Sequence, residues 1–258
     1  MESNTKSNGF VAWPCRITEG EKSSLSELSS CIYSATPSDT RQQWADFVNK
    51  FKTRRFFVDE EEILLKHHVT QIIRDNVYPI SHAETFYRAR INREDNTSFK
   101  NEDLEAPPEH LVGNGRLNQR RVRCLYIADH PKTAIAEMRP WRKALLTVAE
   151  VRLKSTITDP INVIDFVPKT TDSPDSFKRI IGEFFSRPVR PDISDLEYLP
   201  TQCIAEFVKR NGYAGIRYES AVNPGGVNYC LFDPDCMEIK ISHEIEVTYV
   251  IVESQKAP

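Results

Sequence analysis

Val122-Arg-Cys-Leu-Tyr-Ile-Ala128, followed at once by Asp129-His-Pro131 and Thr133-Ala-Ile-Ala-Glu137, decides the fold of this chain. The first run is apolar and rich in β-favouring residues, which predicts a strand. The second run predicts the start of a helix, because proline is tolerated in the first helical turn. Gly115-Arg-Leu-Asn118 comes just before the strand. One arginine, one tyrosine and one glutamate therefore meet at the edge of a strand-turn-helix unit, which makes it a candidate active site.

The sequence on either side of this unit is that of a strand-rich domain. Upstream, residues 85–91 alternate as a strand does, and a polar connection over residues 92–115 is longer than a structural loop needs, which is typical of lids and binding loops. Downstream, helices are predicted over residues 177–185 and 202–209, the second ended by Asn211-Gly212 as a left-handed cap. Strands are predicted over residues 145–153, 162–166, 215–218, 228–232, 237–241 and 246–252.

The first 80 residues differ in character from the rest. Residues 1 to about 38 are rich in Ser, Thr and Glu, and helical periodicity begins at about Asp39. Two helices are predicted in this region, and the second starts near Asp59 and ends before Tyr78-Pro79. The apolar positions of the first helix are Trp44, Phe47, Val48 and Phe51. Those of the second helix are Ile63, Leu64, Val69, Ile72 and Ile73. We expect an N-terminal extension over residues 1–80, largely helical from about 39, and one main domain over residues 81–258.

Composition excludes several classes of protein. The 258 residues are 40% hydrophobic and 28% charged, which suits a globular chain. The 34 basic and 37 acidic residues give a net charge of -3, so no global field attracts nucleic acid or an anionic membrane. The first residues lack the apolar core of a signal peptide, and no run reaches the roughly 18 apolar residues that span a bilayer. We expect a cytoplasmic protein that binds neither membrane nor nucleic acid.

The cysteines and histidines do not form a metal-binding pattern. The six cysteines are scattered, without a CxxC pair or the dense spacing of a disulfide scaffold. His67 and His68 are neighbours that would point about 100° apart on a helix, and no HExxH motif is present. We expect reduced cysteines and no protein-built metal site.

Seven blocks, in order and spacing, resemble the RES domain, a family named for its Arg, Glu and Ser. The resemblance covers roughly residues 80–245, and each block alone would be a weak signal. The blocks are Phe86-Tyr-Arg-Ala-Arg90, Gly115-Arg-Leu-Asn118, Leu125-Tyr-Ile-Ala128, Thr133-Ala-Ile-Ala-Glu137, Leu199-Pro-Thr-Gln202, Gly215-Ile-Arg-Tyr-Glu-Ser220 and Gly225-Gly-Val-Asn-Tyr-Cys-Leu-Phe232.

The resemblance implies an α+β fold like that of the ADP-ribosyltransferases, with a split, mostly antiparallel sheet and flanking helices. It also implies a toxin that depletes cellular NAD and arrests growth by cleaving the nicotinamide-ribose bond, through hydrolysis or phosphorolysis. NAD would be the substrate, with no prosthetic group, and an antitoxin or other regulatory protein would be the partner. Carried over by motif, the catalytic residues would be Arg88, Glu137 and Ser220, and the substrate-binding residues Arg116, Asn118 and Tyr126.

These residue types suit the chemistry of NAD. Arginine forks match phosphate oxygens bidentately and stay charged, so Arg88 and Arg116 suit the pyrophosphate. Glu137 can accept a hydrogen bond from a ribose hydroxyl and stabilise the oxocarbenium-like transition state. Tyr126 offers a ring for stacking and Ser220 a hydroxyl near the ribose. Ser220 lacks a Gly-x-Ser-x-Gly elbow, which disfavours it as a nucleophile.

The sequence leaves the acceptor open. Water would give hydrolysis, inorganic phosphate would give phosphorolysis, and a protein side chain would make the chain a mono-ADP-ribosyltransferase. A non-catalytic nucleotide-binding module is the alternative from a different class. Gln119-Arg-Arg121 stands where the family usually has a Pro-x-Gly turn, so the rim of the pocket is expected to differ here.

Overall fold

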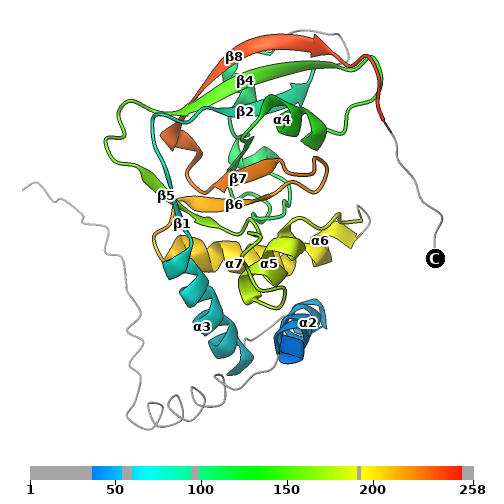
Figure 1. Ribbon diagram of the computed structural model, residues 1–258. Helices are drawn as coiled ribbons and strands as arrows, with labels where there is room; N and C mark the ends of the chain where they lie inside the picture. The colour runs from blue at the N-terminus through cyan, green and yellow to red at the C-terminus, as the bar shows by residue number, and fades with distance from the viewer. Residues whose placement is uncertain (1–36, 54–59, 94–98, 191–192, 252–258) are drawn as a thin grey trace, which may run out of the picture. The chain divides into compact units, whose positions relative to one another are not determined.

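The computed structural model describes residues 37–53, 60–93, 99–190 and 193–251 (Figure 1). The first 36 residues of the expected N-terminal extension, with Cys15 and Cys31, lie outside this set. The described helices are α2 (Pro37–Thr53), α3 (Glu60–Asp75), α4 (Pro131–Glu137), α5 (Phe177–Phe185), α6 (Ser194–Glu197) and α7 (Leu199–Arg210). The described strands are β1 (Val77–Ile80), β2 (Phe86–Ile91), β3 (Leu125–Ala128), β4 (Leu145–Leu153), β5 (Ile161–Asp165), β6 (Gly215–Glu219), β7 (Val227–Leu231) and β8 (Met237–Glu246). None of the described helices is long and apolar enough to cross a bilayer.

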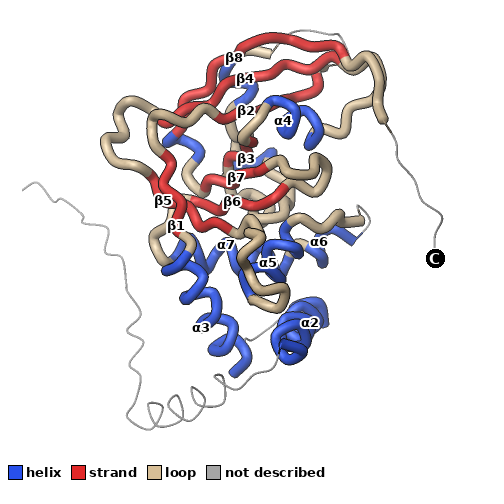
Figure 2. Tube along the Cα trace, viewed as in Figure 1, coloured by secondary structure: helices blue, strands red, loops and turns tan. Residues whose placement is uncertain are grey.

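The strands form one eight-stranded sheet in the order β1-β5-β6-β7-β3-β2-β4-β8 (Figure 2). The pair β5 and β6 is parallel and the other neighbours are antiparallel. The prediction of an α+β fold with a mostly antiparallel sheet and flanking helices is confirmed.

The sheet is nearly interrupted between β2 and β3. These strands share a single register pair, Tyr87 opposite Ala128, whereas β2 pairs with β4 over its whole length. Across the gap, the Arg88 guanidinium donates a 2.7 Å hydrogen bond to the carbonyl oxygen of Tyr126. A charged side chain therefore bridges the split, and the opening leaves room for a site.

Helices cover the sheet on both sides of this split. Helices α5 and α7 pack against β6, while α4 packs mainly against β2 (Figure 1). Phe166, Phe185 and Ile216 are fully buried between β5, β6 and the helices. Each such side chain contributes roughly 1.5–3 kcal/mol through burial, so this core fixes α5 and α7 on the sheet.

Several local predictions agree with the structure because their signals are local. Strand β4 and helix α5 have the predicted bounds. Helix α4 begins at Pro131, and the ring Nδ1 of His130 accepts the backbone N–H of Lys132 at 3.1 Å as its cap. Gly212 after α7 has φ +84°, the left-handed conformation expected of the cap.

Three predictions of strands need correction. The strand predicted over residues 122–128 starts only at Leu125, since a turn closed by the Val122 N–H on the Gln119 carbonyl precedes it. The strand predicted over residues 237–241 continues to Glu246 as β8, because β4 pairs along its whole length through a bulge at Val148/Ala149. The strand predicted over residues 246–252 is wrong, since the described residues 247–251 lie beyond the end of β4 and form no strand. Strand β1 was missed because it contains Pro79, and proline is tolerated at an edge of a sheet, where β1 lies.

Candidate active site

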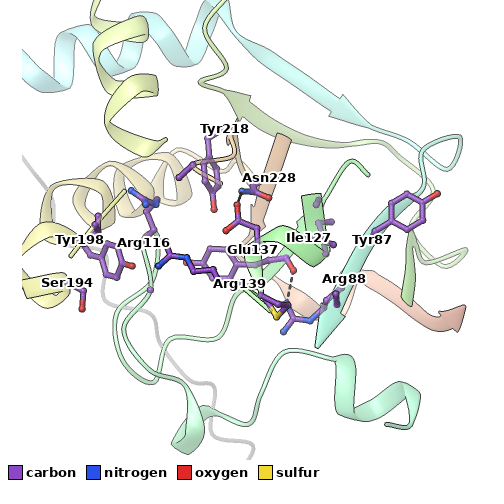
Figure 3. Close-up of a pocket in the computed structure, with 18 of the residues that line it drawn as sticks. Tyr87, Arg88, Arg116, Ile127, Glu137, Arg139, Ser194, Tyr198, Tyr218 and Asn228 are labelled. Carbon is purple, nitrogen blue, oxygen red and sulfur yellow. Dashed lines mark hydrogen bonds between the residues drawn. The ribbon is translucent and has the colours of Figure 1, made fainter. Parts of the chain in front are cut away.

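A cavity of about 570 Å³ opens beside the split in the sheet (Figure 3). Of the residues predicted from the sequence, four line it: Arg88 from β2, Arg116 from the preceding loop, Tyr126 from β3 and Glu137 from the end of α4. The other two, Ser220 and Asn118, do not line the cavity but hydrogen-bond to residues that do, Ser220 to Glu137 and Asn118 to Tyr126. Other lining residues include Tyr87, Asn114, Arg139, Ser194, Tyr198, Tyr218 and Asn228.

Glu137 is held in place through one carboxylate oxygen. Its Oε1 accepts the hydroxyl of Ser220 at 2.7 Å and the side-chain amide of Asn228 at 2.5 Å. The Ser220 oxygen also accepts the backbone N–H groups of Val222 and Asn223, at 3.2 and 3.1 Å. Because the Ser220 oxygen accepts both N–H groups, its hydroxyl proton is donated to Glu137. No described residue donates a hydrogen bond to the second carboxylate oxygen, and Glu137 lines the cavity.

Arg88 is a buried cation with unused hydrogen-bonding capacity. One terminal nitrogen donates to the Tyr126 carbonyl, but its Nε is buried without a partner. Burial, together with the nearby charge of Arg90, lowers the pKa of Arg88 to about 10, so the guanidinium is still protonated at neutral pH. Among the described residues no carboxylate pairs with it. Such a group favours an anionic ligand.

Arg116 is positioned by backbone carbonyls at the end of α5. Its two terminal nitrogens donate to the carbonyl oxygens of Phe184, at 3.3 Å, and Arg187, at 2.8 Å. Its guanidinium carbon lies 5.6 Å from the ring centre of Tyr198, a cation–π contact. The last carbonyls of a helix carry partial negative charge, so they orient the guanidinium without neutralising it.

Helix α7 holds the loop that carries Arg116. The Gln202 side-chain amide donates to the carbonyl oxygens of Gly115 and Asn118, at 2.8 and 2.9 Å. The Thr201 hydroxyl donates to the Arg116 carbonyl at 2.5 Å. The block at residues 199–202 therefore supports the loop from behind the cavity.

Asn118 and Tyr126 complete this support. The Tyr126 hydroxyl donates to Oδ1 of Asn118 at 2.8 Å and accepts the Leu117 N–H at 3.0 Å. The Asn118 amide donates to the carbonyl oxygens of Gly113 and Gln119, and only 5% of Asn118 is exposed. Burial raises the pKa of Tyr126 well above its usual value, so the hydroxyl remains a donor. The structure thus places Asn118 beneath the loop and the polar end of Tyr126 against it.

Tyr218 and Asn228 were not identified from the sequence. They face each other in the register of β6 and β7, and both line the cavity. The Tyr218 hydroxyl points toward Glu137 (Figure 3). Burial, then the neighbouring Cys230 and Glu137, raises the pKa of Tyr218 well above its usual value, which keeps the hydroxyl protonated. Period-2 alternation from Ser220 could have found Tyr218, because residues two apart share a face of a strand.

The described residues that line the cavity carry a net positive charge. They include three guanidinium groups, those of Arg88, Arg116 and Arg139, and one carboxylate, that of Glu137. Within the described part of the chain, no cluster of three or more His, Cys, Asp or Glu residues could hold a metal ion. The side chains that are present can bind an anion and place one carboxylate beside it.

Comparisons with known proteins place the chain in context. The model of the RES domain matches residues 85–250, which is more than half of the chain. Among solved structures, the chain is similar to one from the crystal structure of the M. tuberculosis MbcT-MbcA toxin-antitoxin complex, with 15% sequence identity and a TM-score of 0.40. That match covers 70% of this chain and 91% of the other. No curated protein matches the chain.

Proposed function

The chain belongs to the RES domain family, and from that premise we propose that it is an enzyme that cleaves the nicotinamide-ribose bond of NAD. One observation carries the proposal. The carboxylate of Glu137 and the guanidinium groups of Arg88 and Arg116, which have no carboxylate partner among the described residues, line one cavity. NAD has matching charges, a negative pyrophosphate and a ribose that becomes cationic as the bond breaks. A volume of about 570 Å³ is in the range of small-molecule sites.

Each residue has a role in this reaction. When the bond breaks, its electron pair goes to the ring nitrogen and nicotinamide leaves as a neutral molecule. Glu137 would stabilise the ribosyl cation that remains, which is worth a few kcal/mol in the transition state. Arg88 and Arg116 would hold the pyrophosphate. Water would then give ADP-ribose and a proton, and inorganic phosphate would give phosphorylated ADP-ribose.

The proposal has a cellular consequence. An enzyme that consumes NAD without regenerating it would deplete the cell and arrest growth, so we expect an antitoxin or other regulatory protein as a partner. Expression of the chain should lower the NAD content of cells before growth stops, whereas expression of the Glu137→Gln variant should change neither. Growth arrest with normal NAD content would contradict this part of the proposal.

One assay tests the enzyme. The purified protein is incubated with NAD, with and without inorganic phosphate, while nicotinamide release is followed by chromatography and the co-product is weighed by mass spectrometry. Glu137→Gln should reduce turnover by at least about a hundredfold, the range for losing a group that stabilises transition-state charge. Glu109→Gln, an exposed carboxylate outside the cavity, should retain full activity. Folded protein that releases no nicotinamide in either condition would refute the proposal, and transfer of ADP-ribose to protein would favour mono-ADP-ribosylation instead.

A further inference from the structure

We propose that helix α2 positions Arg116 through the end of helix α5, and so sets the affinity of the cavity for its anionic substrate. Helix α2 covers residues 37–53, whereas the match to the RES domain begins at residue 85. The proposed device therefore lies outside the residues that the RES domain matches. The inference rests on the proposed function, because it concerns how the same cavity binds NAD.

Aromatic side chains join α2 to α5. Trp44 is buried, with 5% of its surface exposed, and its ring centre lies 5.2 Å from that of Phe184 in an edge-on arrangement. Phe47, one turn further along α2, lies 5.3 Å from Trp44 and extends the same cluster. Edge-on aromatic pairs have a preferred geometry, so movement of Trp44 would be transmitted to Phe184.

Arg41 forms a second contact between the two helices. It donates to the Pro174 carbonyl at 2.7 Å and to the Asp175 carboxylate at 3.1 Å, both just before α5. It also lies 3.6 Å from the carboxylate of Glu183 near the other end of that helix. Because these side chains are half-exposed, each pair contributes little alone, but together they align α2 along α5.

Phe184 connects this interface to the cavity. Its side chain meets Trp44, and its carbonyl oxygen accepts one terminal nitrogen of Arg116. The other terminal nitrogen of Arg116 binds the Arg187 carbonyl, just beyond α5. The last carbonyls of a helix lack partners within it, and Arg116 donates to one of them, that of Phe184, and to one carbonyl just beyond the helix. The position of the guanidinium therefore follows the position of the last turn of α5.

The placement of α2 indicates support and not obstruction. All residues that line the cavity fall between positions 87 and 228, so neither α2 nor α3 contributes one within the described chain. Helix α2 packs against both α5 and α7, on the side of α5 away from the sheet (Figure 1). It can act on the cavity only through these helices, and the Trp44–Phe184 contact makes α5 the route to the Arg116 guanidinium.

The test compares substitutions in α2 and α3 at residues that contact opposite ends of α5. Trp44→Ala should raise the KM for NAD about tenfold with less than about a twofold change in kcat, because Arg116 would bind substrate and transition state alike. Trp44→Phe should restore most of the affinity, since it keeps an aromatic ring. The matched control is His68→Ala on α3, whose ring stacks on Phe177 at the start of α5 with 4.0 Å between centres. His68→Ala should leave KM unchanged, and an equal rise in both variants, or a folded Trp44→Ala with normal KM, would overturn the inference.

Two further measurements keep the inference testable. Should Trp44→Ala fail to fold, Arg41→Ala, whose side chain is half-exposed, replaces it and should raise KM about two- to threefold; an unchanged KM counts against the inference. If the wild-type protein releases no nicotinamide, the proposed function fails on its own. Hydrogen exchange of the Ser186 and Arg187 amides then decides. Faster exchange is expected in Trp44→Ala, or in Arg41→Ala where Trp44→Ala does not fold, than in His68→Ala, and equal rates would refute a link through α5.

Discussion

Replacing Ser220 with alanine removes one of the two hydrogen bonds that hold Glu137. The bond from the Ser220 hydroxyl is 2.7 Å long and joins a neutral donor to a carboxylate, while the bond from Asn228 remains. A hydrogen bond to a charged group is worth about 1.5–3 kcal/mol, which corresponds to roughly a ten- to hundredfold change in rate. Because Asn228 still restrains the carboxylate, we expect a loss of about tenfold in kcat/KM for NAD.

The same substitution has a separate cost in stability. The N–H groups of Val222 and Asn223 lose their common acceptor, which costs about 1–2 kcal/mol and lowers Tm by about 3–6 °C. Ser173→Ala is the matched control, because the Ser173 oxygen also accepts a backbone N–H, that of Asp175, but contacts no carboxylate of the cavity. Kinetics of nicotinamide release and thermal unfolding of both variants separate the two effects. If Ser220→Ala lost stability but kept full kcat/KM, the hydrogen bond to Glu137 would have no part in catalysis.

Three further predictions address other parts of the structure. Gly115→Ala should raise the KM for NAD at least about tenfold and lower Tm, because the new Cβ would lie 2.3 Å from Oδ1 of Asn118 and force the Arg116 loop to move; an unchanged KM would contradict the tight loop. Arg121→Gly should raise Tm by about 2–4 °C in thermal unfolding, since Arg121 adopts φ 69°, which costs a non-glycine residue about 1–2 kcal/mol; no gain would mean that this turn is unstrained. Asp172→Asn should cost about 1–2 kcal/mol at pH 7, because it leaves the buried Lys178 without its 3.0 Å partner. Burial raises the pKa of Asp172, but hydrogen bonds from the Lys169 N–H and from Lys178 outweigh it and lower the pKa overall. The extra free energy of unfolding of the wild type over Asp172→Asn is therefore full above the unfolded pKa near 3.8 and is lost as pH falls through the lower folded pKa. Urea unfolding of both proteins at a series of pH values measures this difference. A difference that persisted in strong acid would contradict the prediction.

The sequence predicted those parts of the fold that depend on local signals. Apolar periodicity gave the bounds of β4 and α5, and Pro131 and Gly212 marked the start of α4 and the end of α7. Long-range features were not accessible in this way. The single register pair between β2 and β3 depends on how the two strands diverge in space, which no pattern within either strand records.

The residues of the candidate site were likewise predictable only in part from the sequence. The motif blocks named Arg88, Arg116, Tyr126 and Glu137, which all line the cavity. They could not distinguish a residue that faces the cavity from one that supports it, as Asn118 supports the Arg116 loop, because both kinds occur in the same blocks. The contribution of Phe184 was also hidden from the sequence, since it acts through a backbone carbonyl that any residue could supply.

The interrupted sheet links substrate binding to the integrity of the whole domain. The strands β2, β4 and β8 form one half-sheet and the other five form the second, joined at Tyr87 and Ala128 and by the Arg88 side chain. Arg88 lies on the first half-sheet and Asn228 on the second, and both line the cavity. A ligand that fills the cavity would therefore contact both half-sheets and join them. Ligand at a hundred times its Kd would add about 2.7 kcal/mol to the free energy of unfolding. Under the proposed function, consumption of NAD would therefore also remove the ligand that stabilises the sheet.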